Sequence, residues 1–185
     1  MTYELADGYK IRDQSGLYFL TFTVEGWVDL FTRQTYRDIF LANMAYCREH
    51  KELSVGAYAI MTNHVHLIWR SKSGRLSDTI RDFKSYSTKK FIEAIKQSGE
   101  SRGEWLLYMF EFFAAKTARN KEYKIWTNNN HPEEITSMEF LRTKLNYIHN
   151  NPVRAGWVDR AEDYVYSSAA NYCNRTGKFE VDFLF

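Results

Sequence analysis

Two neighbouring segments with the residue pattern of β-strands are joined by only two polar residues. Leu53–Met61 and His64–Arg70 are rich in β-branched, aromatic and other apolar residues, and Thr62 and Asn63 lie between them. So short a connection favours an antiparallel hairpin, since parallel strands need a long crossover. The chain is thereby restricted to folds that contain an antiparallel sheet.

The rest of the chain supplies further strands and several helices. Leu17–Val24 alternates aromatic and β-branched residues with threonine, which is typical of a strand. Apolar residues at helical spacing mark Thr35–His50 and Leu76–Ile95 as helices. The remaining predictions are a helix over Trp105–Lys116, a helix from a Ser137 cap to Pro152, and short strands over Tyr123–Trp126 and Phe179–Phe183. This order predicts an α+β fold: a ferredoxin-like antiparallel sheet with helices packed on one face, whose open face can carry a site.

The composition is that of an ordinary globular chain, with 44% hydrophobic and 26% charged residues. A chain of 185 residues fits one domain, so residues 1–185 are expected to form a single unit. The first residues lack the apolar core of a signal peptide, and no apolar run approaches a membrane span. Cys47 and Cys173 form no close pair of the kind that binds metals. We therefore expect a cytoplasmic protein with no membrane partner.

The second strand of the hairpin carries a pair of histidines. His64 and His66 are two residues apart, so on a strand both project to the same side, while Val65 and Leu67 face the core. Two imidazoles on one face can bind one divalent cation if a third group joins them. The pair by itself leaves two interpretations open, a metal site or two partly exposed strand histidines.

A tyrosine and an asparagine near the end of the last long helix form a second pair. Tyr147 and Asn151 are four residues apart and share one helical face, whereas Leu145 and Ile148 can point to the core. Tyr147 can then stand beside the histidines. Because most helical tyrosines cover the edge of a core, its position alone leaves a structural role open.

Three segments in order carry a resemblance that covers most of the chain. They are MTNHVHLIW from Met61, YIHNNPVRAGWV from Tyr147 and EDYVYSSAANY from Glu162. Together they resemble the REP-associated branch of the IS200-like tyrosine transposases, which have the HUH endonuclease fold. The resemblance implies one transposase-like domain over residues 1–185, with 98–121 as a helical insertion and 157–185 as a C-terminal extension.

The resemblance also implies site residues and a reaction. His64 and His66 would bind a catalytic Mg²⁺ or Mn²⁺, Asn151 would complete the metal shell, and Tyr147 would be the nucleophile. A phenol has an ordinary pKa of about 10 and is a weak nucleophile at neutral pH, so a metal that polarises the scissile phosphate is needed. The expected product is a 5′-phosphotyrosine and a free 3′-OH, which can rejoin the strand.

Residues suited to DNA contact lie in three places. The segment Arg75–Lys96 contains six basic and three acidic residues. This excess of positive charge indicates either a phosphate-binding surface or a solvated helix face. A tryptophan followed by three asparagines offers stacking and base-edge contacts, or else is a core residue beside a polar turn. The DNA-contact candidates are Arg81, Lys84, Lys89, Lys90, Trp126, Asn129, His131 and Arg154. His149, two residues from Tyr147, faces away from it and is interpreted as structural or as a DNA contact.

The expected partner is single-stranded or hairpin DNA from repeated palindromes, which would make the protein nucleoid-associated; a homodimer stays open. Two other interpretations remain. One is a domesticated DNA- or RNA-binding module without catalysis. The other is an unrelated His-x-His metallohydrolase, which would need further ligands and a water nucleophile. The sequence leaves open the DNA target, the metal used in cells, and attack by Tyr147 in its own or a partner's site.

Overall fold

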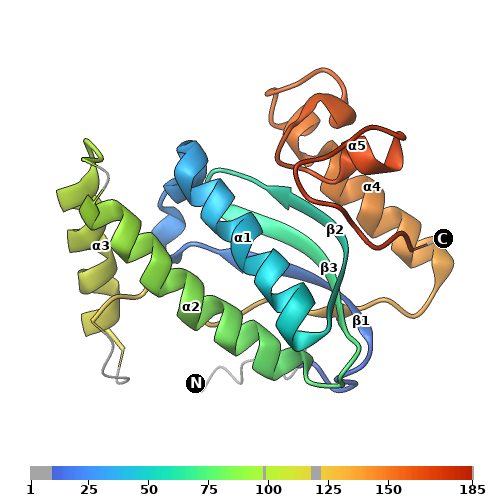
Figure 1. Cartoon of the computed structure of the whole chain (residues 1–185), viewed down its shortest axis with the longest axis horizontal. Coiled ribbons are helices and arrows are strands. Elements are labelled where there is room, and N and C mark those ends of the chain that lie inside the picture. The colour runs from blue at the N-terminus through green and yellow to red at the C-terminus, as the bar shows by residue number, and fades with distance from the viewer. Residues whose placement is uncertain (1–9, 98, 118–121, 185) are drawn as a thin grey trace, which may run out of the picture.

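Four strands form one antiparallel sheet in the order β2-β3-β1-β4 (Figure 1). The computed structural model describes residues 10–97, 99–117 and 122–184. The strands are β1 Leu17–Thr23, β2 Leu53–Ile60, β3 His64–Ser71 and β4 Glu133–Glu134. β2 and β3 form the predicted hairpin, with Ile60 opposite Val65. The α+β class and its antiparallel sheet are confirmed.

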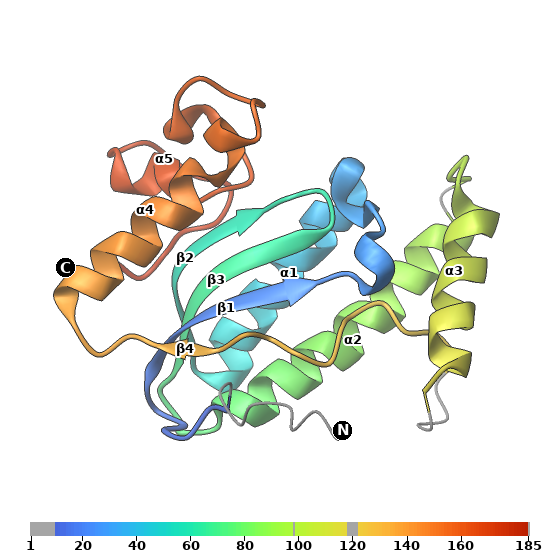
Figure 2. The same ribbon diagram turned by 180° about the vertical axis from the view of Figure 1, so that it is seen from behind.

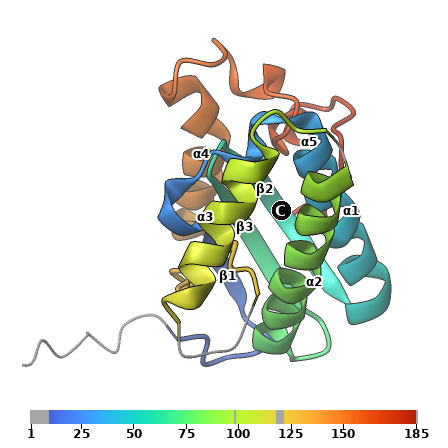
Figure 3. The same cartoon turned by 90° about the vertical axis from the view of Figure 1, so that its left-hand side faces the viewer.

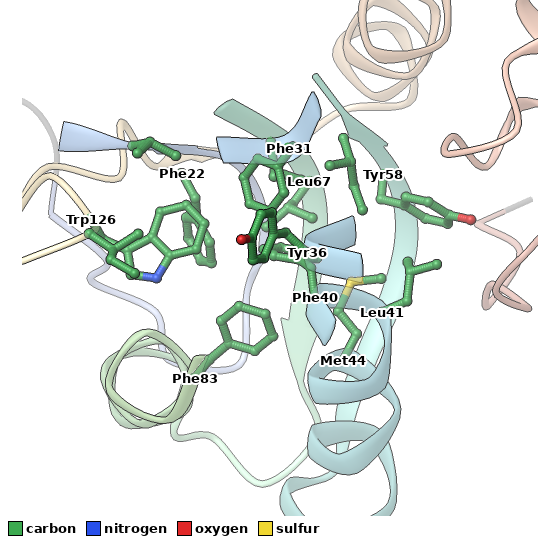
Figure 4. Close-up of a cluster of buried hydrophobic side chains, with 14 of the residues drawn as sticks. Phe22, Phe31, Tyr36, Phe40, Leu41, Met44, Tyr58, Leu67, Phe83 and Trp126 are labelled. Carbon is green, nitrogen blue, oxygen red and sulfur yellow. The ribbon is translucent and has the colours of Figure 1, made fainter. Parts of the chain in front are cut away.

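Two long helices cover one face of the sheet (Figures 1 and 3). They are α1 Gln34–Lys51 and α2 Leu76–Gln97, and α3 Gly103–Ala115 packs beside α2. Val65 and Leu67 of β3 point into this layer and are fully buried, as the alternation predicts. Aromatic rings fill most of the space, as the Phe40 and Phe83 contact shows with ring centroids 4.9 Å apart (Figure 4). This layer is the main hydrophobic core.

The opposite face of the sheet is partly covered by α4 Met138–Arg154, which the expectation of helices on one face and an open second face did not include (Figure 2). Leu145 and Ile148 of α4 pack there on a small second core. Ala57 and Ala59 of β2 belong to the same cluster. Because alanine side chains are short, the helix can lie close to the sheet at this point.

The ends of α4 agree with the sequence prediction at one terminus only. Ser137 caps the helix as predicted, because its hydroxyl accepts a hydrogen bond of 3.2 Å from the amide of Phe140. Pro152 does not end the helix, which continues to Arg154. Proline removes only its own donor, and the amide of Ala155 still donates to the carbonyl of Asn151 at 2.9 Å. Asn151 is therefore an interior residue of the last turn.

The short strands predicted over Tyr123–Trp126 and Phe179–Phe183 are wrong. At 123–126 only Trp126 forms an isolated bridge, to Val24. The segment 179–183 has no strand, but it lies along the edge strand β2. The amide of Asp182 donates to the carbonyl of Val55 at 2.9 Å, and its carboxylate accepts from the amide of Val55 at 2.8 Å. A side chain thus replaces one strand hydrogen bond, so no regular ladder forms.

The remaining elements are short. They are 3-10 helices over Glu25–Trp27, Leu30–Thr32 and Ala161–Asp163, and a final helix, α5, over Ala169–Tyr172. Across the described ranges, none of the helices is long and apolar enough to cross a membrane.

Candidate active site

The two histidines of β3 lie on the face that α4 partly covers. His64 pairs with Thr23 of β1 and His66 with Thr21, at the end of the sheet where β3 begins. Their ring centroids are 4.7 Å apart. The two rings are therefore close enough to bind one ion, on the side of the strand that faces away from the main core.

Each imidazole is oriented through the same ring nitrogen. Nδ1 of His66 lies 3.0 Å from the hydroxyl of Thr21. Nδ1 of His64 lies 2.8 Å from the side-chain oxygen of Asn63, whose amide nitrogen donates to Asp29 at 3.0 Å. Nε2 of both rings is left for another ligand, and that of His66 is buried without a hydrogen-bond partner among the described residues. Partners of this kind orient metal-binding histidines.

Burial keeps both imidazoles neutral at physiological pH. Burial, with smaller contributions from His64 and Lys144, lowers the pKa of His66 to about 3. Burial also lowers the pKa of His64. A neutral imidazole keeps the lone pair that a metal requires, so the pair does not have to lose protons before binding a cation.

Tyr147 reaches the same place from the other side, on α4. Its ring centroid lies 5.1 Å from that of His66 and 5.9 Å from that of Phe19. The side chain is 39% exposed, so a substrate can approach it. The guanidinium of Arg154 lies 5.6 Å from the ring centroid. The phenol and the paired histidines thus meet within one chain.

The protein offers few other groups that could bind a metal here. No cluster of three histidine, cysteine, aspartate or glutamate side chains occurs in residues 10–97, 99–117 and 122–184. Asn151 lies one helical turn after Tyr147, and its side-chain nitrogen is buried and unpartnered within the same ranges. Since the two ends of an amide are assigned from their surroundings, either could face a ligand. Two imidazoles and an amide, completed by water or phosphate oxygens, are a donor set for a divalent cation and suit Mn²⁺ better than Mg²⁺ on ligand softness.

Lys144 is a site residue that the sequence interpretation missed. It lies one turn before Tyr147, forms a 2.7 Å ion pair with Glu133 of β4, and lies 4.4 Å from the centroid of the Phe19 ring. Its charge is among those that act on His66. Its spacing of three residues from Tyr147 is the signal that could have revealed it.

The predicted DNA-contact tryptophan belongs to the core instead. Trp126 is 5% exposed and its indole nitrogen donates to the hydroxyl of Ser87 at 3.0 Å. Little of its ring is open to a base, which favours the alternative of a core residue beside a polar turn. His149 is also buried, with Nε2 2.9 Å from the hydroxyl of Ser168, and burial lowers its pKa to about 4. This agrees with the structural interpretation of His149.

The basic residues of α2 do not form one uniform surface. Arg81 forms ion pairs with Asp78 and Asp82 of its own helix, and Lys90 with Glu93. Lys89 is exposed. Lys84 instead turns inward and donates to the backbone carbonyl of Thr127 at 2.9 Å, so it does not share the outer face with Arg81. Burial lowers the pKa of Lys84 to about 7.

A groove of about 790 Å³ lies between α2 and the segment 122–130. Its lining includes Arg81, Lys84, Lys89, Lys96, Lys124 and Asn130. The segment then follows β1, where the carbonyl of Asn130 accepts from the amide of Thr21 at 2.9 Å. Asn129 and His131 are exposed on either side of Asn130, beside the strand that supports His66. The loop therefore connects the groove with the histidine site.

Comparisons with known proteins all lead to the same group of transposases. The family model described as "Transposase IS200 like" matches residues 17–150. A Haemophilus influenzae protein provisionally named a REP-associated tyrosine transposase is 24% identical over 157 residues, which cover 84% of this chain and 80% of that protein. The structure of a REP-associated tyrosine transposase bound to a REP hairpin is similar with a TM-score of 0.60 and 20% identity, over 95% of this chain and 94% of that one.

Proposed function

The chain belongs to the IS200-like transposase family, and on this premise we propose that it nicks and rejoins single-stranded or hairpin DNA through a 5′-phosphotyrosine on Tyr147. Membership supports an enzymatic, DNA-cleaving role. The observation that carries the finer proposal is the separation of 5.1 Å between the ring centroids of Tyr147 and His66. It brings a nucleophile and a pair of metal-binding groups together from two distant parts of the chain.

The proposed step exchanges one phosphoester for another. The phenol oxygen of Tyr147 attacks the scissile phosphorus, the bond from phosphorus to the 3′ oxygen breaks, the phenol proton passes to solvent, and the departing oxygen takes up a proton as a 3′-OH. A bound Mg²⁺ or Mn²⁺ would polarise the phosphate and offset the developing charge. Attack of a 3′-OH on the phosphotyrosine reverses the step, so rejoining needs no ATP.

The residues of this chain have separate parts in that step. His64 and His66 would hold the cation through Nε2, with Asn151 as a third protein ligand. Arg154 flanks the tyrosine with positive charge and would bind a phosphate next to the scissile one. Lys144 is already paired with Glu133, so its contribution would be smaller. Tyr147 lies beside the histidines of its own chain, which supports attack within one subunit and makes a homodimer unnecessary for completing the site.

DNA would leave the site over the loop of residues 127–131 toward the groove beside α2. Asn129 and His131 would contact it on the loop, and Lys89 in the groove. Lys84 also lines the groove, but its amino group is already bound to the carbonyl of Thr127, so its contribution would be smaller. Arg81 and Lys90 are already paired with acids, so their contribution would be smaller. Hairpin DNA is the preferred partner because the similar structure is described as bound to a REP hairpin. A protein that acts on such repeats would be found in the cytoplasm, associated with the nucleoid.

The decisive experiment uses labelled hairpin oligonucleotides with single-stranded flanks, Mn²⁺ and a denaturing gel. The wild type should give a shifted covalent band, and Tyr147→Phe should reduce its yield by at least about a thousandfold, because a nucleophile is removed. Tyr147→Phe should still bind the oligonucleotide. If the oligonucleotide is cleaved without a shifted band, and the cleavage persists in Tyr147→Phe, a metallohydrolase with a water nucleophile is favoured. Binding without any cleavage by the wild type would favour a domesticated binding module.

A further inference from the structure

An exposed tryptophan stands at the edge of the candidate active site. Trp27 follows β1, its side chain is 65% exposed, and its ring centroid lies 6.0 Å from that of His64. It is one end of a row of four rings, Trp27, His64, His66 and Tyr147, with successive centroid separations of 6.0, 4.7 and 5.1 Å. Both ends of the row are open to solvent, and its middle is the pair of candidate metal ligands.

The backbone at Trp27 has a conformation that a bulky residue seldom adopts. Its φ is 56° and that of Gly26 is 64°, so two successive residues are left-handed. Only glycine adopts this region without steric cost, and a side chain held there is retained when its surroundings impose it. The strained turn aims the indole beside His64 instead of burying it.

Two neighbouring segments hold this turn. The amide of Trp27 donates to the carbonyl of Val24 at 3.0 Å, the amide of Glu25 donates to Ile125 at 2.7 Å, and the carboxylate of Glu25 pairs with Lys124 at 2.8 Å. The ring of Phe113, on α3, occupies the place where a Cβ at Gly26 would lie. In Figure 2 the segment after β1 lies between the end of the sheet and α3. α3 therefore supports the turn from the side away from the histidines.

We propose that Trp27 is a stacking platform for an unpaired nucleobase of the DNA strand next to the scissile phosphate, and that α3 holds the platform in place through Phe113. The inference rests on the proposed function and adds a base-binding position to it. A flat, exposed indole binds any base through its face, so the contact gives affinity and register with little sequence preference. The buried Trp69 and Trp126 have no open face for this role.

The test is a coupling measurement on a Tyr147→Phe background, so that the DNA stays intact. Binding of a fluorescent hairpin with single-stranded flanks is measured by anisotropy at fixed salt, with an abasic site placed at one flank position at a time. On the complete oligonucleotide, Trp27→Ala should weaken binding about tenfold or more. With the abasic site at the stacked position, Trp27→Ala should have no further effect. Trp27→Phe, which keeps a ring, should restore most of the affinity.

Trp105→Ala is the matched control, because Trp105 is also exposed, at 47%, but lies on α3. It should leave binding unchanged at every position. Gly26→Ala should reproduce the loss in Trp27→Ala, since the added methyl collides with Phe113. Equal weakening of complete and abasic oligonucleotides by Trp27→Ala, or no weakening at all, would overturn the stacking proposal while the tyrosine adduct of the wild type still formed. Absence of that adduct would overturn the proposed function, and this inference with it.

Discussion

The two faces of the sheet differ in what they are made of, although the same strand contributes to both. Val65 and Leu67 of β3 enter a broad aromatic and aliphatic core under α1 and α2, whereas His64 and His66 face α4. The second core, under α4, is much smaller and leaves Tyr147 and the histidines beside it. Alternation along one strand thus separates residues that stabilise the fold from residues available for chemistry. The comparison predicts that substitutions of adjacent residues have opposite kinds of effect.

Neighbouring substitutions in β3 give the largest expected contrast. His66→Ala should lower strand cleavage by about a thousandfold or more, because loss of a metal ligand removes several kcal/mol of transition-state stabilisation. Leu67→Ala should instead lower the free energy of unfolding by about 2–5 kcal/mol, because it leaves a cavity in the main core. Cleavage is measured on denaturing gels at saturating Mn²⁺, and stability by urea unfolding of the metal-free protein.

Each variant serves as the control for the other. The division between the faces would be wrong if His66→Ala unfolded the metal-free protein as strongly as Leu67→Ala. It would also be wrong if folded Leu67→Ala lost Mn²⁺ binding to the same degree as His66→Ala.

Much of the first face followed from local pattern in the sequence. The predicted segments Leu17–Val24, Thr35–His50 and Leu76–Ile95 lie within about two residues of β1, α1 and α2. Their apolar spacing repeats over many residues, and each has one buried side. The two-residue connection of β2 and β3 was also sufficient for the hairpin, because the turn is local.

The second face depends on contacts between distant segments. The pattern of α4 showed which of its sides is apolar, but its place on the far face of the sheet depends on contacts with residues of other strands, such as Ala57 and Ala59 of β2. The two tryptophans show the same limit. Trp126, next to three asparagines, is buried because its segment packs on α2, whereas Trp27 is exposed in a turn where the ring of Phe113 lies against Gly26. Neither of these contacts between distant segments can be recognised from the pattern of residues around the tryptophan in the sequence.

An intermediate effect is expected from the hydroxyl that supports His66. Thr21→Val removes the group 3.0 Å from Nδ1 of His66 and keeps the shape of the side chain. Metal affinity should fall about tenfold to a hundredfold, because the imidazole loses the partner that fixes its orientation and tautomer. Mn²⁺ binding is measured by electron paramagnetic resonance titration, and unfolding in urea shows whether stability is kept.

Thr23→Val is the matched control, since Thr23 lies two residues further along β1 and pairs with His64. No hydrogen bond joins its hydroxyl to either imidazole in the part of the chain that the structure describes. It should leave Mn²⁺ affinity close to that of the wild type. Equal losses in both variants would mean that the hydroxyl of Thr21 has no special part in orienting His66.

A pH-dependent effect on stability tests the first face, where Lys84 brings an amino group into the largely apolar layer between β1 and α2. The amino group lies 4.7 Å from the centroid of the Phe22 ring, and burial lowers its pKa to about 7, against a partial opposing effect of Glu25. Between this value and the ordinary lysine pKa of about 10.4, the unfolded chain binds the proton more tightly than the folded one. Stability should therefore rise with pH through this window, by at most about 1.4 kcal/mol per pH unit.

Lys84→Met lacks the titration, so its free energy of unfolding, measured in urea at a series of pH values, should rise less than that of the wild type. Parallel profiles would show that Lys84 is well solvated and that the layer tolerates its charge without cost.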